Sequence, residues 1–149
     1  MGEDRARSTA PARAGLFVAL VVSYVALARL GLALDPNGVA TLVWTPSGLA
    51  LAALIIGGYH LAAAVAIGAF VTNLWVLNAP LVALGITAGN TLEAITGAYL
   101  LQRIPGFRPS LDRFADVIGL VVTALLLSTV VGATIGATVK PRRRIWYAW

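Results

Sequence analysis

Apolar residues in this chain are gathered into five runs that polar segments separate: residues 15–34, 46–58, 61–77, 80–101 and 114–139. The runs are continuously apolar rather than amphipathic, and a run of about 20 such residues is long enough to cross the hydrocarbon core of a bilayer as a helix. The pattern therefore predicts an all-α protein, a polytopic transmembrane helical bundle of about five spans.

The second run is the exception, because residues 46–58 are too few for a full crossing. Pro46 suits the first turn of a helix, and Thr45 is a candidate cap for it. We expect two short, tilted helices, 46–58 and 61–77, joined by a tight turn where the sequence Gly57-Gly58-Tyr59-His60 interrupts the apolar run. A re-entrant hairpin is the alternative.

Composition agrees with a membrane protein. Hydrophobic residues make up 59% of the chain and charged residues 11%, whereas a soluble domain is about half apolar and a quarter charged. Arg and Lys lie in short clusters beside the apolar runs, which is typical of cytoplasmic loops and not of a nucleic-acid-binding surface. The absence of cysteine and the single histidine exclude disulfides, thiolate sites and a histidine metal cluster. We expect no metal, no cofactor and no nucleic-acid partner; the lipid bilayer is the expected surrounding.

The basic clusters also predict an orientation. Residues 1–14 are expected to form a disordered, basic cytoplasmic tail, and the loop 102–113 carries three arginines. Five crossings place both segments on the cytoplasmic side, as short basic loops require. Trp44 and Trp75 then fall at the outer interface. The cluster at residues 140–144 conflicts with this topology, because a fifth crossing would place it outside. Either the last run bends back, or one short run does not cross, or later segments missing from this sequence settle the orientation.

Polar side chains inside the apolar runs are costly in lipid and are therefore candidates for function. Glu93 is the deepest acid, and Asn90 precedes it by one helical turn. Gly85, Gly89 and Gly97 recur with Glu93 every four residues, which predicts one narrow stripe turned inward, towards partner helices or a water-filled cavity. Glu93 either takes part in a proton-linked or ligand-linked site, together with Asn90 and Arg29, or holds helices together as a buried structural group. The residues alone give the packing role more support.

Two further polar residues lie within the runs. Arg29 either extends to the outer interface or faces inward as the partner of a buried carboxylate. Asn73 is of a type that often forms hydrogen bonds between helices.

A second face of small residues is predicted in the last run: Ser128, Gly132 and Gly136. Such a face packs within the chain or between two copies in a homodimer. The chain carries no motif of a soluble catalytic site, so we do not expect an enzyme by itself.

Three stretches resemble the membrane-associated sensor domain of the first MASE type: residues 44–54, which begin Trp-Thr-Pro-Ser-Gly, residues 89–101, which begin Gly-Asn-Thr-Leu-Glu, and residues 128–136. Residues 68–74 lie between the first two stretches, as in the family. The resemblance covers residues 15–149. Together with the buried polar positions it gives the candidate residues for sensing or helix coupling: Trp44, Pro46, Ser47, Glu93, Asn90, Asn73 and Arg29.

The resemblance implies a domain of the bacterial inner membrane with about eight spans, of which this chain resembles the first five. Such domains precede histidine kinase, diguanylate cyclase or phosphodiesterase modules. They receive a signal, mostly of unknown identity, for two-component or cyclic-di-GMP pathways. The chain departs from the family in lacking the last spans and an output module, so we expect a domain truncated at its C-terminus.

Two other functions stay open. Glu93 and Asn90 are suited to line the polar path of a small transporter or channel subunit, although the sequence has no inverted repeat. The small-residue faces equally suit a structural membrane anchor.

Overall fold

The computed structural model describes residues 3–34, 44–110, 112–122, 130 and 134. Within these residues the secondary structure is helical, with no strand, as the sequence predicts. The elements are α1 (Glu3–Ala33), α2 (Thr45–Gly57), the 3₁₀ turn η1 (Tyr59–Leu61), α3 (Ala62–Leu77), α4 (Pro80–Gln102) and α5 (Phe114–Leu120).

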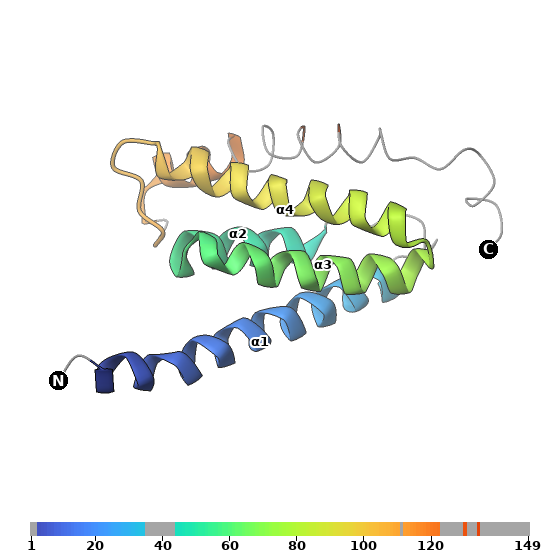
Figure 1. Ribbon diagram of the computed structural model, residues 1–149. Helices are drawn as coiled ribbons and strands as arrows, with labels where there is room; N and C mark the ends of the chain where they lie inside the picture. Colours follow the sequence, from blue (N-terminus) through green and yellow to red (C-terminus); the bar gives the residue numbers. More distant parts are fainter. Residues whose placement is uncertain (1–2, 35–43, 111, 123–129, 131–133, 135–149) are drawn as a thin grey trace.

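Four helices enclose one core (Figure 1). Helix α3 packs against α4 and α1, and α2 packs against the same two neighbours from another side. Half of the core residues are alanines, which let helix backbones approach closely where no water drives association. The core residues are Leu20, Tyr24, Ala50, Leu54, Leu61, Ala64, Val65, Ala69, Ala94 and Ala98.

Helix α2 extends along only part of this bundle. Its 13 residues correspond to a length of about 20 Å, against about 30 Å of bilayer hydrocarbon. The end of α2 is level with the end of α4, because the Tyr59 hydroxyl donates to Gln102 Oε1 at 3.0 Å. Its start falls short of the opposite end of the bundle, where α3 turns into α4 (Figure 1). Helix α2 therefore begins inside the bundle.

The start of α2 confirms one expectation and corrects another. Pro46 lies in the first turn and is buried. Trp44, not Thr45, is the N-cap residue, and no side chain caps the helix. Thr45 is instead the first helical residue, so its hydroxyl is not placed to receive the first free N–H groups.

Tight turns connect α2 to α3 and α3 to α4. Gly58 has φ +96°, a conformation that favours glycine. Asn78 ends α3 in the left-handed conformation, φ 48°, and its N–H donates to Leu74 O at 2.9 Å. Asparagine tolerates this conformation better than most residues. The tight turn predicted between residues 46–58 and 61–77 is confirmed.

The helix bounds agree with the predicted runs for α2, α3 and α4, and α5 begins at the predicted residue. The N-terminal segment differs, since α1 already begins at Glu3 where we expected a disordered tail. Alanine and arginine, which are frequent there, have high helix propensity and extend a helix that the apolar run has nucleated. Ser128, Gly132, Gly136 and the cluster at 140–144 lie outside the described residues.

Within the described residues, two helices are long and apolar enough to cross a membrane: Ala12–Ala33 and Tyr59–Leu77. Helix α4 has the length, but Asn90 and Glu93 lower its hydropathy and it is not among them. The full set of five spans stays a prediction.

Candidate functional site

Several polar side chains of the apolar helices bond within their own helix. Thr72 Oγ1 donates to Gly68 O at 2.9 Å, and Asn73 Nδ2 donates to Ala69 O at 2.8 Å. The carbonyl four residues earlier is always within reach of such side chains, so a buried polar group can be satisfied locally. The hydrogen bond of Asn73 is thus not the interhelical one that we predicted.

Asn90 behaves differently, because its side chain reaches another helix. Asn90 Nδ2 lies 3.5 Å from the hydroxyl of Tyr24, a residue of α1 that is only 1% exposed. The Trp44 side chain is hydrogen-bonded to the same hydroxyl, and Glu93 is close enough to interact with it electrostatically. Tryptophan only donates, so the indole N–H points at the tyrosine oxygen. We call Tyr24, Trp44, Asn90 and Glu93 the Tyr24 cluster; it joins α1, the start of α2 and α4.

A glycine on α3 lets Tyr24 occupy this place. A Cβ atom at Gly68 would lie 2.9 Å from Tyr24 Cβ and 3.0 Å from Tyr24 Cγ, closer than such atoms normally approach. Glycine therefore brings the backbones of α1 and α3 together at this level. The Tyr24 ring lies against α3 while its hydroxyl meets α4.

Trp44 contacts the core of the bundle, and its place at the outer interface stays a prediction. Its side chain is half-buried and bonded to Tyr24, because α2 begins inside the bundle and not at its end. Pro46 and Ser47 follow in the first turn, where the Ser47 N–H donates to Trp44 O at 3.0 Å. Two of the candidate residues from the sequence, Trp44 and Asn90, thus contact the same hydroxyl, and a third, Glu93, lies within electrostatic range of it.

Arg29 lies one to two helical turns after Tyr24, nearer the C-terminal end of α1. Its Cζ atom lies 4.1 Å from the centroid of the Trp75 ring, and both side chains are exposed. This is the geometry of a cation–π pair, and it supports the first interpretation of Arg29, as an interfacial residue.

The predicted glycine stripe on α4 is only partly the packing face. Gly89 and Gly97 are buried, whereas Gly85 and Glu93 are half-buried. At 3.6 residues per turn a repeat of four drifts by about 40° each time, so the four positions wrap about 120° around the helix. The face with spacings of three, four and seven is the more deeply buried one: Ala83, Thr87, Ala94, Ala98 and Leu101.

Tyr24 is the residue that sequence reasoning missed. It was counted as apolar within the first run, although a lone hydroxyl in such a run needs a partner. The requirement of this hydroxyl for a hydrogen-bond partner is the feature of the sequence that identifies Tyr24 as a candidate residue. Within the described residues no group of three or more His, Asp or Glu is placed to hold a metal ion. The arrangement instead connects three helices through the Tyr24 hydroxyl of α1, which contacts Trp44 at the start of α2 and Asn90 in α4.

Comparison with known proteins assigns the chain to a family. No curated protein and no solved structure matches it. The model of the MASE1 family matches residues 15–144, which include α1 from Gly15 onwards, α2 to α5 and the whole Tyr24 cluster. The apolar helices agree with the membrane location of that family. The chain therefore belongs to the MASE1 family of membrane-associated sensory domains.

Proposed function

We propose that this chain is the input part of a signalling protein of the bacterial inner membrane. It detects a signal in or near the bilayer and relays it to a module on its C-terminal side, a histidine kinase or a cyclic-di-GMP enzyme. Family membership supports the sensory role. The observation that carries the proposal is the Tyr24 cluster, because a change at this one hydroxyl acts on three helices at once.

A signal can act only by favouring one arrangement of the helices over another. A hydrogen bond between membrane helices contributes about 0.6 kcal/mol and at most about 1.7 kcal/mol. Making or breaking the bond between Asn90 and Tyr24 therefore changes the ratio of two arrangements by roughly threefold to twentyfold. Packed helices move as rigid bodies, so a shift at the cluster is carried to the ends of α1 and α4.

The orientation belongs to the same proposal. The N-terminus and the loop after α4 lie on the cytoplasmic side, where their arginines are favoured. Tyr59 and Gln102 share that end of the bundle, while Arg29 and Trp75 lie towards the opposite one. A homodimer through the small-residue face at Ser128, in the segment outside the described residues, stays a prediction.

The test joins the full chain to a diguanylate cyclase module through one added transmembrane helix, which returns the C-terminal end to the cytoplasm, and measures cyclic-di-GMP in cells. Tyr24→Phe removes only the central hydroxyl, and Glu93→Gln removes only the charge. Both variants are expected to change the cyclic-di-GMP output by about threefold or more. Threefold is the change in the ratio of two helix arrangements that the loss of one average interhelical hydrogen bond produces. Tyr99→Phe is the matched control, because it removes a hydroxyl from an exposed residue of α4. If all variants reach the membrane equally and signal like the parent chain, the cluster has no role in relay.

One observation also favours a second candidate, a transporter or channel. Short helices that begin inside the membrane beside polar groups are typical of transport sites, and α2 begins in this way at the Tyr24 cluster. Proton or ion flux into liposomes that contain the purified chain tests it. Flux that Tyr24→Phe abolishes would support transport, and the absence of flux at high protein density would exclude it for the ions tested.

A further inference from the structure

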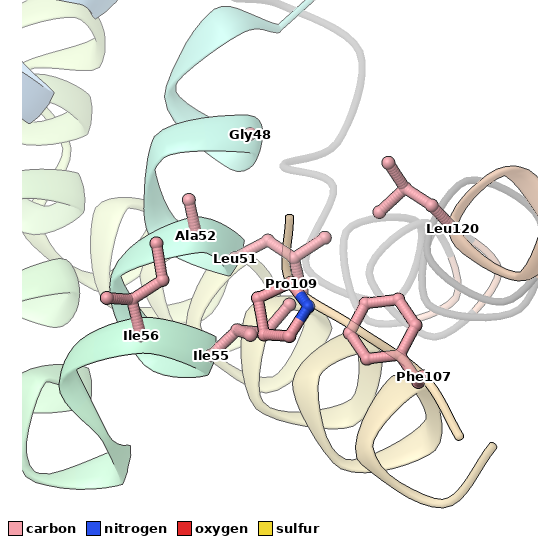
Figure 2. A pocket seen from close by; sticks show the side chains of 8 residues that line it. All are labelled: Gly48, Leu51, Ala52, Ile55, Ile56, Phe107, Pro109 and Leu120. Atoms are coloured by element: carbon pink, nitrogen blue, oxygen red, sulfur yellow. The ribbon is translucent and has the colours of Figure 1, made fainter. Parts of the chain in front are cut away.

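An apolar pocket lies beside α2, on the side away from the Tyr24 cluster. Its volume is about 180 Å³. Leu51, Ala52 and Ile55 line it from α2, Phe107 and Pro109 from the loop after α4, and Leu120 from α5 (Figure 2). Every lining side chain is apolar, so a polar ligand would lose its hydrogen bonds to water without replacement.

The loop that closes the pocket is strongly basic. Arg108 is exposed and lies between Phe107 and Pro109, the two loop residues in the pocket wall. The loop 102–113 carries three arginines and one aspartate. Apolar lining and positive charge therefore occur side by side, at the end of the bundle that Tyr59 and Gln102 share.

A buried carboxylate fixes the loop in this position. Asp116 in the first turn of α5 is 3% exposed, and its Oδ1 accepts the backbone N–H of Arg108 at 3.3 Å. Gly119 lies against Ile104, where an added Cβ would be 2.7 Å from Ile104 Cδ1. Helix α5 and the loop thus form one wall, and the Arg108 side chain is not part of the pocket lining.

We propose that this pocket binds an acyl chain of an anionic phospholipid whose phosphate contacts Arg108. An acyl chain is in apolar surroundings both in the bilayer and in the pocket, so apolar burial does not favour one lipid over another. The preference for one lipid must therefore come from the shape of the pocket and from the charge of the head group. Arginine binds phosphate with paired hydrogen bonds, and one arginine near an anionic membrane surface contributes about 1 kcal/mol. The proposal rests on the membrane location of the chain and not on its role in signalling.

The test reconstitutes the full chain in phosphatidylcholine vesicles that contain a photoreactive phosphatidylglycerol, with the reactive group on the acyl chain. Mass spectrometry after illumination is expected to find label in residues 51–55 and 107–109. Excess unlabelled phosphatidylglycerol should remove this label, and excess phosphatidylcholine should not. Label spread evenly over all lipid-facing helices, or competition by both lipids alike, would overturn the proposal. The competition needs no variant, so it holds whatever a substitution does to folding.

Two variants locate the two parts of the site. Ala52→Phe fills the pocket and should reduce the label to the level of exposed α3 peptides, whereas Ala63→Phe, at an exposed alanine of α3, should leave it unchanged. Arg108→Gln should lower the preference for phosphatidylglycerol about fivefold, the ratio that ~1 kcal/mol represents. Arg13→Gln, at an exposed arginine of α1, is its control.

The remaining outcomes also decide the question. If the pocket peptides take no label and cross-link instead to a second copy or to another segment of the chain, that segment is the occupant and the lipid proposal is wrong. If Ala52→Phe and Ala63→Phe behave alike, the label does not come from the pocket.

Discussion

Replacing Gly68 by alanine tests the close approach of α1 and α3 on which the Tyr24 cluster depends. The new Cβ would lie 2.9 Å from Tyr24 Cβ, which is attached to the α1 backbone and cannot rotate away. Ordinary contact begins at 3.4 Å, so the two helices must separate there. Because Asn90 is already 3.5 Å from the Tyr24 hydroxyl, at the limit of a hydrogen bond, the separation also weakens that bond.

The magnitude follows from two opposing effects. Inserting an extra methyl group into a packed core costs about 1–3 kcal/mol of stability. Replacing glycine by alanine inside a helix stabilises the folded protein by roughly 0.5–1 kcal/mol. Gly15→Ala in α1 isolates the second effect, because nothing lies within 4 Å of its new Cβ. Gly68→Ala is therefore expected to be about 1–3 kcal/mol less stable than Gly15→Ala.

The free energy of unfolding can be measured in mixed micelles titrated with a denaturing detergent. Tryptophan fluorescence is a suitable signal, since Trp44 belongs to the cluster, and circular dichroism should give the same midpoint if unfolding is two-state. Gly15→Ala should raise the midpoint and Gly68→Ala should lower it. Equal shifts for the two variants would refute the close approach of α1 and α3 at this level.

Three further predictions use the same chain. In a double-mutant cycle, Tyr24→Phe and Asn90→Leu should show a coupling energy of about 0.6 kcal/mol, the mean for interhelical hydrogen bonds in a membrane protein; additive effects on unfolding would mean that the pair does not interact. Arg29→Gln and Trp75→Leu should each reduce stability by about 0.5–1 kcal/mol and also show coupling, as an exposed cation–π pair does; independent effects would count against the pair. Ser110→Cys introduces the sole cysteine of the chain, and a membrane-impermeant maleimide should label it only after cells are opened; labelling of intact cells would reverse the proposed orientation.

Helix α2 has a distinct place in the structure, because its two sides face the two sites. Pro46, Ala50 and Leu54 are buried towards the core, and Trp44 at the start of the helix belongs to the Tyr24 cluster. Leu51 and Ile55 face the pocket that we assign to a phospholipid. The same short helix therefore contacts the polar centre of the bundle on one side and the proposed lipid site on the other.

The sequence alone determined the class of the protein and most helix bounds. Long apolar runs separated by Pro, Gly and Arg clusters depend only on local composition and on the length needed to cross a bilayer. For this reason the predicted bounds of the runs that became α2, α3 and α4 agree with the structure. Glu93 and Asn90 were identified for the same reason, since a polar group in an apolar run is costly wherever its partner lies.

Only the tertiary structure decided which residues meet. Tyr24 reads as an ordinary apolar-run residue until α1 is placed against Gly68 and α4. The contact between Trp44 and Tyr24 becomes apparent only when the start of α2 is placed beside α1. Helix rotation and depth depend on contacts between segments that are distant in the chain, such as Asn90 with Tyr24, and local patterns carry no information about those contacts.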